Sequence, residues 1–158
     1  MPSFFEALEA RVHLSTSPTG MKRTDVNLDA GWKFQRVDKS AYAATTFDDS
    51  KWAAVNLPHT WNNKDGQDGG NNYYRGASWY RRHLALGPSY AGKRLFIKFD
   101  GANNVTDLYI NGTRVGKHAG GYSAFVFDVT NYLKATGDNV LAVKVSNSEA
   151  NDTAPLAG

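Results

Sequence analysis

A polar, glycine-rich stretch, Asp65–Arg75, carries the side chains best suited to binding a molecule rich in hydroxyl groups. Its sequence, DGQDGGNNYYR, mixes carboxylates, amides, tyrosines and an arginine with no aliphatic side chain. Amides and carboxylates bond to hydroxyls, and tyrosine offers a flat apolar ring with a polar tip. The same composition is typical of a solvated loop whose tyrosines pack on a neighbouring strand or domain, so both interpretations stay open. The predicted ligand-binding residues are Asp65, Asp68, Asn71, Asn72, Tyr73, Tyr74 and Arg75.

The positions of the acidic residues argue against catalysis by this chain alone. Glycoside hydrolysis generally needs two carboxyl groups, about 5–5.5 Å apart in retaining enzymes and further apart in inverting ones. The only glutamates are Glu6, Glu9 and Glu149. Most aspartates, such as the pair Asp48-Asp49, stand where turns are expected, because aspartate bonds readily to nearby backbone. We therefore predict that the chain contains no catalytic residue.

Metal and cofactor chemistry is also disfavoured. The sequence has no cysteine, which excludes disulfides and zinc–thiolate sites. The four histidines, His13, His59, His83 and His118, lack the i, i+4 spacing of a zinc protease. The DGQDGG run lacks the ligand spacing and closing glutamate of a calcium loop. We predict no metal and no cofactor, and we expect His59 to be a packed structural residue.

Composition predicts one globular domain with a real core. The chain has 158 residues, of which 41% are hydrophobic and 21% charged. The net charge of +3 arises from basic and acidic residues mixed along the chain, which disfavours a nucleic-acid partner. No apolar run reaches the ~20 residues needed to cross a bilayer, and no signal peptide is visible.

From Asp25 onward the apolar residues alternate as they do in β-strands. Leu95, Ile97 and Phe99 share one face of a predicted strand, and several similar runs are separated by Gly, Asn, Asp and Pro. Asn111-Gly112 predicts a two-residue hairpin turn, because both residues tolerate positive φ. The pattern predicts an all-β antiparallel sandwich, a jelly roll or a close relative. The four tryptophans are expected in the core.

Residues 1–23 differ from the rest and are expected to be a leader and linker, with the β domain covering 24–158. Phe4, Leu8 and Val12 would share one face of a short helix, and STSPTG is typical of a linker. The run FEALEARVHLS also resembles a short N-terminal segment of exported bacterial proteins, with Ala10 where that segment has proline. This resemblance implies export.

Three phrases together resemble the N-terminal sugar-binding domain of glycoside hydrolase family 2: FDDSKWAAVNLPHTWN, DGQDGGNNYYRGASWYRR and GKRLFIKFDGANNVTDLYINGTRVGKHAGGYSAFVFDVTNYLKATGDNVLAVKVSN. The family follows this jelly roll with an immunoglobulin-like domain and a TIM barrel that holds both catalytic glutamates. The resemblance therefore implies a non-catalytic partner of those two domains, inactive on its own. It also implies a loop contribution to the sugar pocket by Asp65–Arg75, with Asp68, Asn71, Asn72 and Tyr74 as the better candidates. The phrases resemble the β-galactosidase branch more than the glucuronidase branch, which implies a β-galactoside-like carbohydrate.

Two alternatives and one structural expectation remain. The domain would alternatively be a free-standing carbohydrate-binding module, or a purely structural domain that docks onto the barrel. In the family, a segment like SNSEANDTAPLAG is followed by a closing strand, whereas this sequence ends at Gly158. We therefore expect a sandwich that lacks its last strand and exposes an edge able to pair with a second copy.

Overall fold

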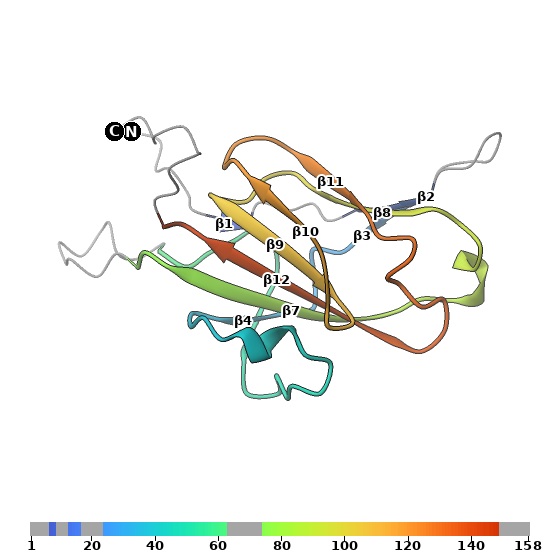
Figure 1. Ribbon diagram of the computed structural model, residues 1–158, viewed down its shortest axis with the longest axis horizontal. Helices are drawn as coiled ribbons and strands as arrows, with labels where there is room; N and C mark the ends of the chain where they lie inside the picture. Colours follow the sequence, from blue (N-terminus) through green and yellow to red (C-terminus); the bar gives the residue numbers. More distant parts are fainter. Residues whose placement is uncertain (1–6, 9–12, 17–23, 63–73, 149–158) are drawn as a thin grey trace.

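Alternating apolar residues build two facing antiparallel sheets (Figure 1). The structure is a computed structural model that describes residues 7–8, 13–16, 24–62 and 74–148. One sheet has the strand order β10-β9-β12-β7-β4-β5 and the other β11-β8-β2-β3, while β1 pairs with β6. The predicted all-β antiparallel sandwich is confirmed. The strands are β1 (Ala7–Leu8), β2 (His13–Thr16), β3 (Asp25–Asn27), β4 (Trp32–Gln35), β5 (Ala53–Val55), β6 (His59–Thr60), β7 (Ala77–Ala85), β8 (Leu95–Phe99), β9 (Val105–Ile110), β10 (Thr113–Ala119), β11 (Phe125–Asp128) and β12 (Asp138–Ser146).

The main core fills the space between the two sheets. In β8, Leu95, Ile97 and Phe99 are buried, whereas the residues between them are only partly covered. They belong to one cluster with Leu108 of β9 and Leu141 of β12. The period-2 pattern read from the sequence therefore identifies the buried face of this strand correctly. All four tryptophans are buried, as predicted.

A second core covers the outer face of the six-stranded sheet. Trp79 of β7 packs there with Tyr42 from the 3₁₀ helix η1 (Ser40–Ala43) and with Trp52. The ring centroids of Tyr42 and Trp52 lie 4.7 Å apart at 78°, an edge-to-face contact. The first five residues of β7 are consequently buried on both faces.

Arg81 joins this outer cover to the sheet. Its side chain is fully buried, and its Nε donates to Asp49 Oδ2 at 2.8 Å. Its terminal nitrogens donate to the carbonyls of Tyr42, Ala44 and Phe47. The guanidinium thus satisfies backbone carbonyls of an irregular segment that has no strand partners. Asp49, expected only as a turn residue, is instead the buried counter-ion of Arg81.

The predicted hairpin is confirmed, and the predicted N-terminal helix is wrong. Asn111 and Gly112 have φ values of 50° and 82° and connect β9 to β10. Ala7–Leu8 pairs with β6 instead of forming a helical turn, and His13–Thr16 lies between β8 and β3. Open strand edges offered backbone partners to this segment, and such pairing outweighs a weak helical pattern. The expected linker after Thr16 and the C-terminal end of the chain lie outside the described residues.

We expect the buried ion pair to be essential for stability. Asp49→Ala leaves the Arg81 guanidinium buried without its counter-ion, which should lower the free energy of unfolding by about 3–5 kcal/mol. Urea unfolding would measure the change. Lys98→Ala breaks a partly exposed pair with Asp100 and serves as the control, with an expected cost below about 1 kcal/mol. Equal effects of the two substitutions would contradict this role of Arg81.

Candidate functional site

The predicted ligand-binding stretch joins β6 to β7 at one end of the sandwich. Of its residues, the structure describes Tyr74 and Arg75. Asp65, Asp68, Asn71, Asn72 and Tyr73 lie outside the described residues. The described chain stops at Asn62 and resumes at Tyr74, so these two residues mark where the stretch meets the sandwich (Figure 1).

Two asparagine side chains hold the backbone of Tyr74. The Asn62 amide donates to the Tyr74 carbonyl at 3.0 Å and accepts from the Tyr74 N–H at 3.1 Å. Asn147 donates to the same carbonyl at 2.7 Å. A side-chain amide carries one donor group and one acceptor, so Asn62 pairs with Tyr74 much as a neighbouring strand would. The stretch therefore begins and ends on one hydrogen-bonded unit.

The side chain of Tyr74 is also engaged with the sandwich. Its hydroxyl donates to the Ala77 carbonyl at 2.7 Å, and the Arg36 guanidinium lies 5.3 Å from its ring centroid. Partial burial and the nearby Asp38 carboxylate raise the pKa of Tyr74, while Arg36 opposes that rise. In this arrangement Tyr74 anchors the stretch, and its contact with a ligand stays a prediction.

Asn147 links this anchor to the end of the central strand pair. Its Oδ1 accepts from the Gly76 N–H at 2.7 Å, and its own N–H donates to the Gly76 carbonyl. A Cβ on Gly76 would lie 2.8 Å from the Tyr74 hydroxyl, so only glycine leaves room for that side chain. Asn147 is 2% exposed, which makes it a structural anchor inside the sandwich.

The core face of the six-stranded sheet becomes polar toward this end. Along β12 and just beyond it the inward residues run Leu141, Val143, Val145 and then Asn147, and β9 changes in the same direction from Leu108 to Thr106. The strand register places the last inward residues side by side across four strands. These residues are His118, Thr106, Val145 and Ser78.

Within the part of the chain that the structure describes, several polar atoms at this end are enclosed without a hydrogen-bonding partner. They include Ser78 Oγ, Thr106 Oγ1, His118 Nε2 and Asn103 Oδ1. A Cβ on Gly121 would lie 2.7 Å from Asn103 Oδ1, so the Gly121 backbone covers that oxygen closely. Enclosed polar groups without partners cost stability and are uncommon in native folds, so their concentration marks this end as the candidate site.

A group of aromatic rings lies around Tyr80, two residues from Ser78 along β7. His59 Nδ1 lies 2.9 Å from the Tyr80 hydroxyl, and both rings contact Phe34. Burial lowers the pKa of His59 and raises the pKa of Tyr80, so both are neutral near pH 7. His59 is the packed structural histidine that the sequence predicts.

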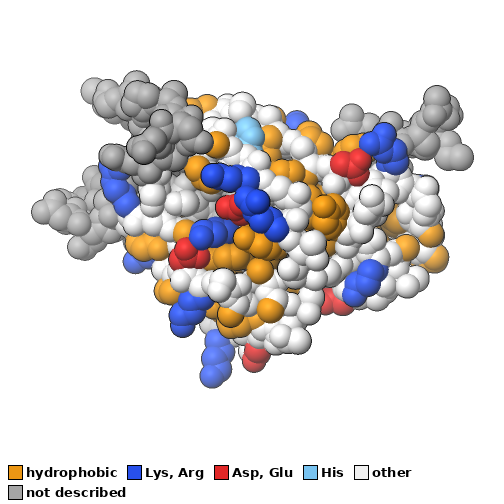
Figure 2. All heavy atoms as spheres, in the orientation of Figure 1, with side chains coloured by type: hydrophobic (Ala, Val, Ile, Leu, Met, Phe, Trp, Pro, Cys, Tyr) orange, Lys and Arg blue, Asp and Glu red, His pale blue; other side chains and the backbone are white. Residues whose placement is uncertain are grey.

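The described part of the chain carries its acidic residues as aspartates only. It contains no glutamate, and no three His, Asp or Glu residues within it are grouped to hold a metal. On the outer face of the six-stranded sheet, Arg114 pairs with Asp107 and Lys144 with Asp38. Figure 2 shows basic and acidic side chains interspersed on the visible face. No helix among residues 24–62 and 74–148 is long and apolar enough to span a bilayer.

The anchoring residues Asn62, Asn147 and Arg36 were missed by the sequence analysis. Each stands at or just beyond a strand end, a position where Asn and Arg are common for many reasons. A weak signal existed in the change from Leu141, Val143 and Val145 of β12 to Asn147 just beyond its end.

Comparison with known proteins places this geometry in a family. The family described as "Glycosyl hydrolases family 2, sugar binding domain" matches residues 24–154. A β-glucuronidase of Bacteroides fragilis is 37% identical over 137 residues, covering 87% of this chain and 19% of the relative. A β-galactosidase of Thermoanaerobacter pseudethanolicus is 35% identical over 136 residues, covering 85% of this chain and 18% of the relative.

Solved structures show the same fold. The crystal structure of a Bacteroides uniformis β-glucuronidase matches with a TM-score of 0.80 and 42% identity, over 87% of this chain and 16% of that one. This chain therefore spans less than a fifth of the length of these relatives. The relatives carry both names, glucuronidase and galactosidase, at similar identity, so these likenesses do not separate the two branches.

Asn147→Ala should loosen the anchor of Tyr74. The substitution removes a hydrogen-bond acceptor from the Gly76 N–H and a donor from the Tyr74 carbonyl, which should cost about 2–3 kcal/mol of folding free energy. Hydrogen exchange of the Gly76 amide should accelerate more than exchange in the middle of β7. Asn27→Ala, which loses exposed turn bonds to Asp29, is the control and should cost less than about 1 kcal/mol. Unchanged exchange at Gly76 would contradict the assignment.

Thr106→Val should stabilise the fold. Valine keeps the shape of the side chain and removes an enclosed hydroxyl without a partner, so the free energy of unfolding should rise by about 1 kcal/mol. Thr130→Val is the opposite case, because its hydroxyl accepts from the Leu95 N–H and donates to Asp128. Urea unfolding of both variants tests this, and destabilisation by Thr106→Val would show that its hydroxyl is satisfied in solution.

Proposed function

We propose that this chain, which belongs to the sugar-binding domain family of family 2 glycosyl hydrolases, is the non-catalytic N-terminal module of a retaining β-glycosidase. The observation that carries the proposal is the family match over residues 24–154 on a fold shared with a β-glucuronidase at a TM-score of 0.80. In the proposed enzyme, two glutamates of a separate TIM barrel break the bond, and this module supports the pocket beside them.

The geometry supports a recognition role for the stretch that follows Asn62. A binding loop works best when a rigid scaffold fixes its ends, because less conformational entropy is then lost on binding. Asn62 and Asn147 fix Tyr74 in this way. We propose that Asp65, Asp68, Asn71, Asn72, Tyr73 and Arg75 supply the sugar contacts between these anchors.

The substrate of the proposed enzyme is a β-linked galactoside or glucuronide. The sequence phrases favour a galactoside, and the relatives include enzymes named for either sugar. The alternatives are a free-standing sugar-binding module and a domain that only docks onto the barrel. Binding by the isolated chain separates the alternatives, since docking alone requires no affinity for sugar.

Titration of the chain with methyl β-galactoside and methyl β-glucuronide tests the recognition role. We expect weak, saturable binding that Asp68→Asn reduces about fivefold, since a hydrogen bond to a charged group contributes about 1.5–3 kcal/mol, not all of which an amide loses. Asp138→Asn, an exposed carboxylate at the far end of β12, is the matched control and should leave affinity unchanged. A chain that binds neither glycoside would exclude the free-standing sugar-binding module and leave the pocket-loop role and docking alone.

Chromogenic β-galactosides and β-glucuronides should not be hydrolysed by the chain. Turnover that Asp68→Asn abolishes would place an active site within this domain and overturn the proposal.

A further inference from the structure

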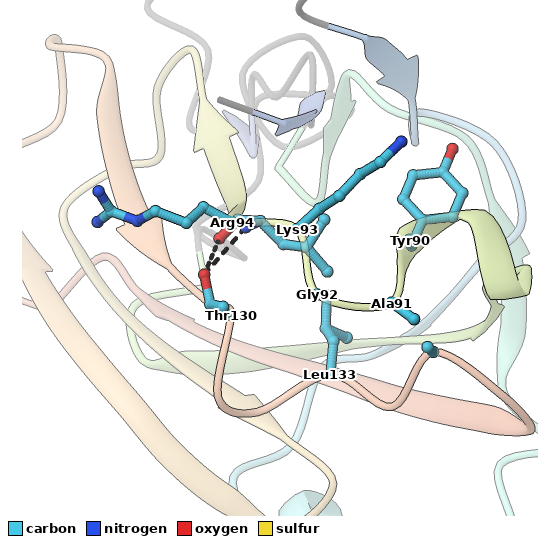
Figure 3. Close-up of a pocket in the computed structure, with 9 residues that line it drawn as sticks. Tyr90, Ala91, Gly92, Lys93, Arg94, Thr130 and Leu133 are labelled. Atoms are coloured by element: carbon cyan, nitrogen blue, oxygen red, sulfur yellow. Dashed lines mark hydrogen bonds between the residues drawn. The ribbon is translucent and has the colours of Figure 1, made fainter. Parts of the chain in front are cut away.

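A pocket lies at the end of the sandwich opposite Tyr74 (Figure 3). The connection from β7 to β8 lines one side with Tyr90 to Leu95, and the connection from β11 to β12 lines the other with Thr130, Leu133 and Ala135. Its volume is about 250 Å³. The register of β7 with β12 separates this end from the candidate site, because Ala85 pairs with Asp138 here and Ala77 with Ser146 there.

Backbone hydrogen bonds hold the walls of the pocket. The Leu95 N–H donates to Thr130 Oγ1 at 2.9 Å, and the Val129 N–H donates to the Leu95 carbonyl at 2.9 Å. The Lys93 N–H donates to the Tyr90 carbonyl at 3.2 Å and closes a turn. Hydrogen bonds therefore join the two connections to each other and also form within each of them. The pocket is formed before any ligand binds.

The lining combines an aromatic ring, aliphatic side chains and positive charge. Tyr90 and Leu133 are half-buried and pack against the main core, and Leu95 belongs to it. The charged lining residues are Lys93 and Arg94, with no carboxylate among the lining residues. Figure 3 shows the Arg94 side chain extending away from Tyr90 and Lys93.

The two cations differ in how they are compensated. Arg94 donates to Asp128 Oδ2 at 2.8 Å, and its guanidinium lies 5.1 Å from the Phe96 ring centroid. Lys93 is half-buried, and its ammonium lies 5.9 Å from the Tyr90 ring centroid. Within the described residues, no carboxylate forms an ion pair with Lys93. Lys93 is thus a lining residue with no ion-pair partner in the described part of the chain, and its ammonium lies beside an aromatic ring.

We propose that this pocket binds a single sugar ring that bears a carboxylate, such as a uronic acid unit. The Tyr90 ring offers an apolar surface to the C–H face of a pyranose, and the Lys93 ammonium attracts its carboxylate. The volume lies below the range of about 300–1,000 Å³ that holds drug-sized ligands, which suits one ring. This site is separate from the proposed loop-end recognition and does not depend on it.

Amide chemical shifts of the ¹⁵N-labelled chain test the proposal during titration with sodium glucuronate, glucose and sodium acetate. Glucuronate should change the amide chemical shifts of residues 90–95 and 130–135 in a saturable way. Added salt should weaken glucuronate binding, because it screens the attraction between the two charges. Glucose, which lacks the carboxylate, should bind about fivefold more weakly, and acetate should give no saturable shift. Equal effects of acetate and glucuronate would show simple anion attraction and overturn the proposal.

Two variants and one control make the test specific. Lys93→Met keeps the aliphatic stem and removes the charge, so glucuronate affinity should fall about fivefold while glucose affinity is unchanged. Tyr90→Leu keeps an apolar side chain and should weaken both sugars. Lys51→Met, at an exposed lysine of the outer cover, should change neither. Shifts confined to the region of Tyr74 and Asn147 would overturn this inference and leave the loop-end proposal standing.

Discussion

The nine-residue antiparallel pairing of β7 with β12 is the constraint on which the rest of the structure depends. It runs from Ala85 opposite Asp138 to Ala77 opposite Ser146 without a register shift. A slip of one residue would turn every inward side chain outward, because side chains alternate along a strand. The same register delivers Asn147 to Gly76 at one end and Asn139 to the Leu84 carbonyl at the other. Both ends of the sandwich are therefore positioned by a single ladder.

The sequence predicted the buried residues of a strand well where one face is buried and poorly where both are. β8 follows the simple alternation, so its core residues could be named in advance. β7 does not, because an irregular segment covers its outer face and encloses Arg81. An arginine in a strand of alternating residues normally indicates a face that is exposed to solvent. The burial of Arg81 requires the carbonyls of Tyr42, Ala44 and Phe47 as hydrogen-bond acceptors. These carbonyls meet only in the folded chain, so no local sequence pattern indicates them.

The candidate site was only half visible in the sequence for a related physical reason. A stretch rich in glycine, amides and tyrosine can be predicted to bind a ligand from its composition. Its anchors are two single asparagines, Asn62 and Asn147, that lie far apart in the chain. Asn147 reaches Tyr74 across 73 positions because β12 lies beside β7. Asparagine at a strand end also fits an ordinary turn, so its type alone does not indicate a long-range bond.

The loop end of the sandwich buries polar residues where the middle of the sandwich buries apolar ones. At the loop end, the inward residues of β9 and β12 change together from apolar to polar, which gives up hydrophobic stabilisation. Enclosed hydroxyls of Ser78 and Thr106 add a further cost. Natural folds usually accept such local inconsistencies where function requires them. The long apolar strands between the ends offset that cost, so the sandwich can keep Asn62 and Asn147 hydrogen-bonded to Tyr74 at this end.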